Sequence, residues 1–329
     1  MATVALKNPE LRIIPLAEAE FPAIEALFDE QCAEWLELFR WDYSRPSRLI
    51  LDVVRQHELT GFAATEGGAT IGFAFYVIED NRCSIGDIYV SKPWRGLGAD
   101  KQLAQAILDK LKLIPRLRRV ESQFVGVGNP AATELFLARG FTRLDRHYML
   151  ARLDEANCGE SPSLPTISLR SWREGDFASA ARIIYRSYRG EHDSRINSQY
   201  QTEEGCAELL TILTEHVWCG DFLPSVSRVA IDHATGNRVG VLIASRIAQG
   251  AGHIGQISIL PAYQGRGLGR LMIGMAMSEL ERRGYETMSL AVTDANVSAY
   301  HLYQSCGFHT VHQFPVFYRE RQRFAASDF

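Results

Sequence analysis

The sequence predicts a mixed α/β protein of the α+β class, built from two tandem copies of one domain. The first observation is an internal repeat: Ile85–Val90 resembles Ile254–Ile259, and Arg95–Asp100 falls on Gln264–Gly269 at the same offset. The second is that both copies place an apolar strand, a glycine-rich turn and a helical apolar pattern in succession. With 329 residues, the chain is long enough for two such domains.

Both copies predict the same elements in the same order. A short strand opens each copy, two helical segments follow, and then two strands flank turn residues that tolerate positive φ. A strand, loop, helix, strand and helix come next, and each copy is expected to end in a strand pair. The expected opening segments are strands at 11–14 and 167–170, helices at 17–39, over part of 46–57, and at 177–189 and 203–215, and hairpin strands at 61–66, 69–78, 229–232 and 238–246.

A stretch rich in glycine, proline, serine and acidic residues separates the copies and is typical of a linker. The predicted domains are therefore 1–152 and 166–329, joined by a linker at 153–165.

Composition excludes several classes of protein. A net charge of −4 disfavours a broad basic face, so no nucleic-acid partner is expected. No apolar run approaches membrane-spanning length and the N-terminus lacks a signal-peptide core, so no membrane partner is expected either. The six cysteines contain no C-x-x-C pair, which favours reduced thiols in a cytoplasmic protein and no metal site. The sequence does not indicate an oligomeric state.

The segment Gln264–Gly269 lies between an apolar strand pattern and a helical one. A helix N-terminus exposes unpaired amides and partial positive charge, and glycines allow a close approach, so this turn suits a pyrophosphate. A dinucleotide fingerprint fails because Arg270 replaces its third glycine, and no Gly-Lys-Ser/Thr of a Walker loop follows. An ordinary glycine-rich turn is the alternative.

The pattern Q-x-x-G-x-G after a strand resembles the acyl-CoA pyrophosphate loop of the GNAT superfamily of N-acetyltransferases. A second pattern of that family, N-x-x-A-x-x-L-Y followed by G-F, is matched at Asn296, Ala299, Leu302, Tyr303, Gly307 and Phe308. The resemblance implies two GNAT-like domains, each a splayed mixed β-sheet flanked by helices. It also implies acetyl-CoA as cofactor, CoA as product, and an amine of a small molecule or peptide as acceptor.

The resemblance places the cofactor in the second copy, where strand backbone would pair with the pantetheine arm and loop amides would hold the pyrophosphate. The expected cofactor-binding residues are Ile257, Ser258, Ile259, Gln264, Gly265, Arg266, Gly267, Leu268, Gly269, Arg270 and Asn296. For the two arginines a solvated helix face is the alternative to phosphate contact. For Asn296 the alternative is a helix cap.

The expected catalytic residues are Tyr303 and His253. In related enzymes the tyrosine at the position of Tyr303 protonates the departing CoA thiolate. The alternative role for Tyr303 is aromatic packing against the sheet. The general base is not evident from the sequence, and His253 is a candidate because it lies on the strand that would carry the thioester. Tyr188, Asp193 and Asn197 are expected to bind the acceptor, with a solvated polar loop as the alternative.

The first copy departs from the pattern at two positions. Asp100 replaces the last loop glycine, and Phe136 stands where the second copy has Tyr303, although Asn129 falls on Asn296. A carboxylate about 4 Å from a phosphate costs about 4 kcal/mol at an effective dielectric constant near 20. We therefore expect a degenerate first domain and a catalytic second domain. The alternatives are activity in both domains, or a non-catalytic acyl-CoA-binding or scaffold protein.

Overall fold

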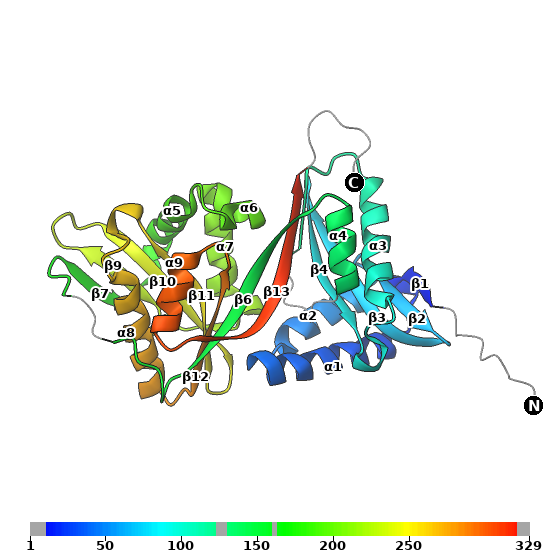
Figure 1. The fold of residues 1–329 in the computed structure, drawn as a ribbon, viewed down its shortest axis with the longest axis horizontal. Coiled ribbons are helices and arrows are strands. Elements are labelled where there is room, and N and C mark those ends of the chain that lie inside the picture. The colour runs from blue at the N-terminus through cyan, green and yellow to red at the C-terminus, as the bar shows by residue number, and fades with distance from the viewer. Residues whose placement is uncertain (1–10, 123–129, 160–162, 321–329) are drawn as a thin grey trace, which may run out of the picture. The chain divides into compact units, whose positions relative to one another are not determined.

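The computed structural model of the protein describes residues 11–122, 130–159 and 163–320 (Figure 1). Asn129 and the linker positions 160–162 lie outside the described residues. The chain divides into two compact units. Unit 1 comprises Met1–Glu34, Ser47–Arg143 and Pro315–Phe329, and unit 2 comprises Trp35–Pro46 and Leu144–Phe314.

The two repeats carry matching elements. The first repeat contains β1 (Arg12–Pro15), α1 (Phe21–Phe39), α2 (Ser44–Arg55), β2 (Gly61–Glu66), β3 (Ala69–Glu79), β4 (Arg82–Val90), α3 (Ala99–Lys112), β5 (Arg119–Ser122), α4 (Pro130–Ala138) and β6 (Thr142–Arg152). The second contains β7 (Ile167–Ser171), α5 (Phe177–Tyr188), α6 (Asp193–Ile196), α7 (Glu203–Glu215), β8 (Asp221–Phe222), β9 (Arg228–Asp232), β10 (Arg238–Ala248), β11 (Ala251–Ile259), α8 (Leu268–Arg282), β12 (Thr287–Thr293), α9 (Val297–Ser305) and β13 (His309–Glu320).

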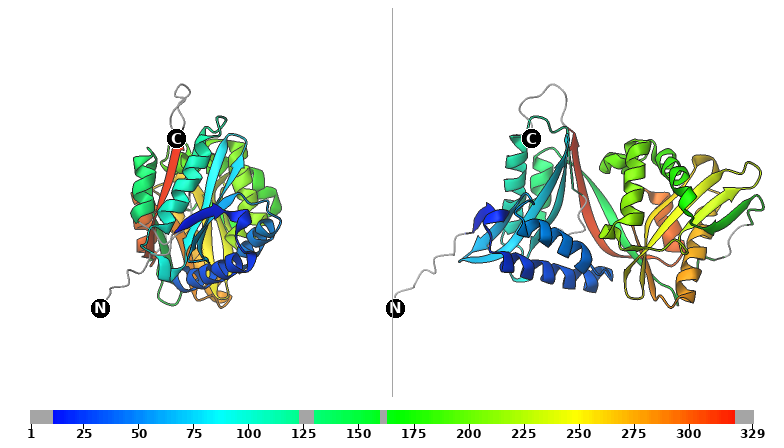
Figure 2. Two further views of the ribbon diagram at one scale, coloured as in Figure 1. Left: turned by 90° about the vertical axis from the view of Figure 1, so that its right-hand side faces the viewer. Right: turned by 180° about the vertical axis from the view of Figure 1, so that it is seen from behind.

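In unit 1 the strand order is β1-β2-β3-β4-β5-β13, with only the β4–β5 pair parallel. Helices α3 and α4 lie on one side of this sheet (Figure 2). Their buried residues there include Leu103, Ile107 and Phe136. On the other side, Phe28 of α1 stacks on Phe73 of β3 at a centroid distance of 4.3 Å. The sheet is therefore covered by helices on both faces.

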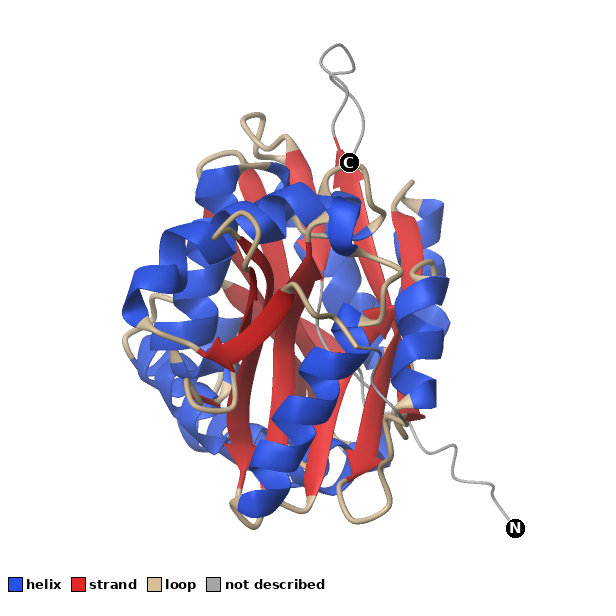
Figure 3. Ribbon diagram, turned by 90° about the vertical axis from the view of Figure 1, so that its left-hand side faces the viewer, coloured by secondary structure: helices blue, strands red, loops and turns tan. Residues whose placement is uncertain are grey.

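In unit 2 the strand order is β6-β12-β11-β10-β9-β7, and β8 also pairs with β10. Alternate residues of β10 enter different cores, as the two-residue period of a strand requires. Leu242 packs with α8, whereas Val241 and Ile243 pack with α5 and α7. Figure 3 shows these helices (blue) on both sides of the strands (red). The predicted mixed α/β class is confirmed.

The sheet of unit 2 splays where the loop begins. The parallel pairing of β11 with β12 covers only Ala251–Ile254, whereas its pairing with β10 continues to Ile259. A register shift at Gly255 accompanies the change. The edge of Ile257–Ile259 that faces β12 therefore has no strand partner among the described residues.

The repeats exchange their last strands. The part of β6 from Arg146 to Arg152 pairs with β12 in unit 2, although β6 ends the first repeat. The end of β13 pairs with β5 in unit 1, although β13 ends the second repeat. The expected local strand pair at the end of each copy is thus wrong, because each repeat supplies one strand and receives the other. The compact units differ accordingly from the linear domains 1–152 and 166–329.

Two further observations bear on the class of protein. No helix in the described ranges has the length and apolar character needed to cross a bilayer. Across the same ranges, no group of three or more histidine, cysteine or acidic side chains has a metal-binding arrangement.

Candidate active site

The turn between β11 and α8 has the backbone that its glycines predict. Gly265 and Gly267 adopt φ of 70° and 84°, in the left-handed region that disfavours side chains. Gln264 Nε2 donates to the carbonyl of Ile259 at 2.9 Å and anchors the start of the turn. A Cβ added at Gly269 would lie 3.0 Å from Leu302, so this glycine lets α8 approach α9 closely. No side chain caps α8, which leaves its first amides available.

A cleft of about 610 Å³ lies at this turn and is bounded by β11, α8, α9 and the end of α5. Its lining includes every predicted cofactor-binding residue except Arg266. That guanidinium instead lies over the ring of Tyr263, with 5.6 Å from Cζ to the ring centroid. The positions chosen from the motif therefore do come together, with one exception, around a single cavity.

Two residues of the lining also have structural contacts. The guanidinium of Arg270 bonds to the carbonyl of Cys158 and, at 2.8 Å, to the hydroxyl of Ser305. The side chain of Asn296 accepts a hydrogen bond from the amide of Ala299 at 3.2 Å and so caps α9. The capping alternative for Asn296 is present in the structure, and its place in the lining keeps a cofactor role open.

Tyr303 of α9 lies in the wall of the cleft and is only 7% exposed. Burial raises the pKa of its hydroxyl well above the usual value, and the nearby Tyr188 and Asp193 raise it further. Its ring meets Phe308 edge-on at 6.0 Å, so it also packs in the core. A hydroxyl that stays protonated at neutral pH can donate a proton to a thiolate.

A polar network forms the wall next to Tyr303. Tyr188 stacks on Tyr200 at a centroid distance of 4.0 Å. The buried Gln256 accepts from the Tyr200 hydroxyl at 2.8 Å and donates to the Tyr188 hydroxyl at 3.0 Å and to Ser258 at 2.9 Å. Gln256 lies on the strand expected to carry the thioester, and Tyr200 in the segment expected to line the acceptor pocket, but no role was predicted for either residue. The polar residues Gln256 and Ser258, at alternate positions of an otherwise apolar strand, are the sequence signal for such a role.

The other predicted acceptor residues take different positions. Tyr188 lines the cleft, whereas Asp193 and Asn197 do not. Asp193 is nearly buried and accepts a hydrogen bond from Thr293 at 2.5 Å. Asn197 accepts from the amide of Gln199 at 2.9 Å and caps a short 3-10 turn, Ser198–Gln201. The contacts of Asn197 are therefore those of a local cap. Glu191, between α5 and α6, is a further acidic group in the lining.

His253 is not brought to the cleft. Its Nδ1 lies 2.9 Å from the hydroxyl of Ser289, and its ring packs against Trp41 at 4.8 Å. Burial lowers its pKa to about 3, so the imidazole is neutral and weakly basic at neutral pH. The position and low basicity argue against the prediction that His253 is the general base, because a base must reach the proton that it removes.

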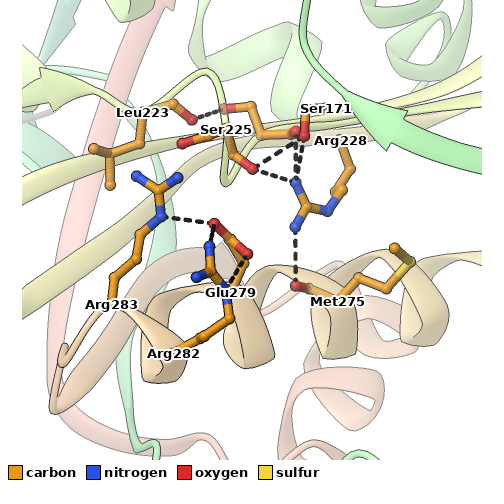
Figure 4. A network of polar contacts seen from close by, with 9 residues as sticks. Ser171, Leu223, Ser225, Arg228, Met275, Glu279, Arg282 and Arg283 are labelled. Carbon is orange, nitrogen blue, oxygen red and sulfur yellow. Dashed lines mark hydrogen bonds and ion pairs between the residues drawn. The ribbon is translucent and has the colours of Figure 1, made fainter.

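A second polar network fixes α8 against the edge of the sheet (Figure 4). The buried Arg228 of β9 donates to the carbonyls of Ser225 at 2.5 Å and Met275 at 3.2 Å, and to the hydroxyl of Ser171 at 3.3 Å. Burial lowers its pKa. Because Met275 belongs to α8, this arginine ties the middle of that helix to β9 and thereby supports the glycine turn at its start.

The repeated mixed sheet and the glycine-lined cleft are the features expected of an acyltransferase. The chain belongs to the Acetyltransferase (GNAT) family, which it matches over residues 22–141 and 195–308. It is thus an enzyme of the GNAT N-acetyltransferase class with two family regions. Members of this family generally use acetyl-CoA.

Curated relatives match short stretches. The [Ribosomal protein bS18]-alanine N-acetyltransferase of Haemophilus influenzae is 44% identical over 55 residues, which is 17% of this chain and 37% of that protein. The mycothiol acetyltransferase of Tsukamurella paurometabola is 38% identical over 61 residues, 18% of this chain and 21% of that protein. The matched stretches thus span little more than a third of the first relative and about a fifth of the second.

Solved structures match nearly the whole chain. A GCN5-related N-acetyltransferase from Sphaerobacter thermophilus has a TM-score of 0.61 at 22% identity, with 94% of this chain and 95% of that chain covered. A tandem GNAT protein from the clavulanic acid biosynthesis pathway has a TM-score of 0.55 at 16% identity, covering 94% and 98%. At these identities the likeness establishes the fold, including its tandem form.

Proposed function

We propose that the protein transfers the acetyl group of acetyl-CoA to an amine of a small molecule or peptide, in the cleft of unit 2. The observation that carries this proposal is one cavity lined by the glycine turn, the splayed edge of β11 and Tyr303. Its size, its two left-handed glycines and the uncapped helix start fit a long thioester carrier that ends in a pyrophosphate.

The residues of this chain have separate roles in the proposed reaction. Amides at the start of α8 hold the pyrophosphate, and the edge of Ile257–Ile259 pairs with the pantetheine arm as an added strand would. The amine nitrogen attacks the thioester carbonyl, a C–N bond forms, the C–S bond breaks, and the nitrogen loses a proton. The departing sulfur takes a proton from the Tyr303 hydroxyl, and the proton that the nitrogen releases to water restores that hydroxyl. Acetyl-CoA supplies the activated acyl group.

The acceptor is proposed to enter from the side of Tyr188 and Glu191. The names of the relatives include the alanine of a ribosomal protein and mycothiol, which supports a range that covers peptide and small-molecule amines. Tyr188 and Gln256 offer polar contacts there, and Glu191 offers negative charge near a cationic amine.

Acetyl-CoA binding measured by isothermal titration tests the cofactor site. We expect one site per chain and at least about tenfold weaker binding for Gly267→Glu, because a carboxylate then faces the pyrophosphate. Gly98→Glu is the matched control, since Gly98 has a similar φ of 89° in unit 1 and the same backbone strain. Equal losses in both variants, or no affinity in the wild type, would overturn the cofactor assignment.

Catalysis is tested by thiol release from acetyl-CoA over a panel containing alaninamide, putrescine and benzylamine. Release that depends on an amine, with the acetylated amine identified by mass spectrometry, supports the transferase. Tight acetyl-CoA binding without release on any amine would instead favour an acyl-CoA-binding protein.

A further inference from the structure

The strand that the first repeat contributes to unit 2 brings a cation close to the acceptor side of the cleft. In the antiparallel pairing of β6 with β12, Arg146 lies directly opposite Thr293. Opposed residues of such a pair project to the same face of the sheet. Arg146 Nε accordingly donates to the Thr293 hydroxyl at 3.3 Å. This pair exists only because the repeats exchange their last strands.

Asp193, at the start of α6, completes a three-residue cluster with this pair. Thr293 donates to Asp193 Oδ1 at 2.5 Å, and Arg146 Nη2 lies 3.3 Å from the same oxygen. The side chains of Arg146 and Asp193 are 17% and 12% exposed. Both contacts use Oδ1. Among the described residues Oδ2 has no hydrogen-bond partner, and it is not sealed from solvent.

The cluster borders the cleft without lining it, because Glu191, two residues before Asp193, and Asn296, three residues after Thr293, are both in the lining. After burial, the negative charge of Asp193 is among the causes that raise the pKa of both Tyr188 and Tyr303. These two tyrosines line the cleft and come from α5 and α9. A carboxylate with one oxygen fixed by two hydrogen bonds and the other without a partner among the described residues is suited to accept a charge-assisted hydrogen bond from an ammonium group.

We propose that Asp193 binds the ammonium form of the acceptor through Oδ2 and that Arg146, with Thr293, is a positioning residue that fixes the carboxylate. This inference rests on the proposed acetyltransferase function and narrows its acceptors to cationic primary amines. It also makes the first repeat necessary for the second repeat's site, through β6.

Steady-state kinetics of Arg146→Gln test the positioning role. With each amine of the panel that the wild type acetylates, we expect the acceptor KM to rise at least about tenfold and kcat to change less, because the loss is mainly in acceptor binding. Affinity for acetyl-CoA should stay within about twofold. In Arg146→Lys the acceptor KM should rise less than in Arg146→Gln. Thr293→Ser should keep the wild-type acceptor KM, whereas Thr293→Val should raise it.

Arg152→Gln is the matched control. Arg152 lies on the same strand, but it is 57% exposed and pairs with Asp154 at the surface, so its loss should leave both KM values unchanged. A thermal unfolding scan of each variant separates loss of the site from loss of the fold.

Asp193→Asn tests the charge requirement. With another amine of the panel as the acceptor whose acetylation is followed, alaninamide should compete in the wild type far more strongly than lactamide, its neutral hydroxyl counterpart, and the variant should lose this difference. Unchanged acceptor KM in a folded Arg146→Gln enzyme, or an unchanged preference for the ammonium probe in Asp193→Asn, would overturn the inference alone. Acetyl-CoA binding without turnover of any amine would overturn the proposed function together with it.

Discussion

In unit 2, Gln264 Nε2 donates to the carbonyl of Ile259 at 2.9 Å, and in unit 1 Arg95 Nε donates to the carbonyl of Val90, the residue that matches Ile259, at 2.9 Å. The glycines that follow have matching left-handed φ, 81° at Gly96 and 89° at Gly98. The first repeat has therefore kept the backbone of the loop. The two regions differ in the side chains next to the loop and at the start of the helix that follows it.

In unit 1 an ion pair spans the loop and α1. Two guanidinium nitrogens of Arg95 lie 2.7 and 2.5 Å from the carboxylate oxygens of Glu34, and the guanidinium also lies over the ring of Tyr89. Burial alone would raise the pKa of Glu34, but its bonds to Arg95 outweigh this and lower it. Gln264 is neutral and forms no such pair. We propose that this ion pair closes the edge of β4 that corresponds to the cofactor edge of β11.

The start of the helix differs as well. Asp100 is buried in the first turn of α3, and its Oδ2 has no hydrogen-bond partner among the described residues. Burial raises its pKa. Its side chain thus occupies the helix start in unit 1, whereas unit 2 leaves the first amides of α8 without a side-chain cap. We propose that the Asp100 side chain occupies the anion site of unit 1, so that the fold is retained while the site is lost.

The largest expected effect concerns the hydroxyl that only the second repeat has. Tyr303→Phe should lower kcat about 10²-fold or more, because a positioned acid is lost, while the affinity for acetyl-CoA changes less than about twofold. Single-turnover kinetics and titration measure the two quantities. Phe136→Tyr places the same hydroxyl in unit 1 and should add no activity. A wild-type kcat in the Tyr303→Phe enzyme would contradict the assignment of Tyr303 as the general acid.

Asp87 of β4 occupies the position that matches Gln256 in β11, so a titratable side chain in unit 1 corresponds to a neutral one in unit 2. Burial raises the pKa of Asp87 from 3.8 to about 6, and the bond from Gln31 offsets only part of this. Because the folded-state pKa is raised, unit 1 should lose stability as pH rises from about 4 to about 6. The expected decrease in the free energy of unfolding is about 3 kcal/mol, at about 1.4 kcal/mol per pKa unit.

Asp87→Asn should abolish this pH dependence and stabilise unit 1 at pH 7, as measured by hydrogen exchange of β3 and β4. Gln256→Glu is the reciprocal change and should introduce the same sign of pH dependence in unit 2. Equal pH dependence of β3 and β4 protection in the wild type and in Asp87→Asn would contradict the assignment.

The smallest expected effect comes from the ion pair that closes the first loop. Arg95→Gln leaves Glu34, which is 5% exposed, without its cation and should destabilise unit 1 by about 2–3 kcal/mol. The double variant with Glu34→Gln should recover part of this loss, because no buried charge remains. Denaturant unfolding monitored at Trp94 measures both. An Arg95→Gln protein as stable as the wild type would mean that the pair contributes no stability.

The cofactor side of the cleft was predictable because its geometry is local. Left-handed glycines, an uncapped helix start and a tyrosine seven residues after Asn296 depend on neighbouring residues, and all but Arg266 of the predicted set line one cavity. The acceptor side was predictable only in part: Tyr188 lines the cleft as expected, whereas Asp193 and Asn197 do not. Gln256 bonds to Tyr188 and Tyr200, which are 68 and 56 residues away, and Arg146 meets Asp193 across 47 residues. His253 was chosen for its strand, but packing against Trp41 removed it from the cleft.

The sequence by itself determined the two repeats, the order of their elements and the glycine turn, because periodicity and backbone φ are properties of contiguous residues. Only the tertiary structure decided which strand pairs with which. No local pattern identifies the partner of β6 or β13, so packing assigned β6 to β12 and the end of β13 to β5. That exchange placed Arg146 beside Thr293 and Asp193, for the physical reason that sheet partners are selected by long-range contacts.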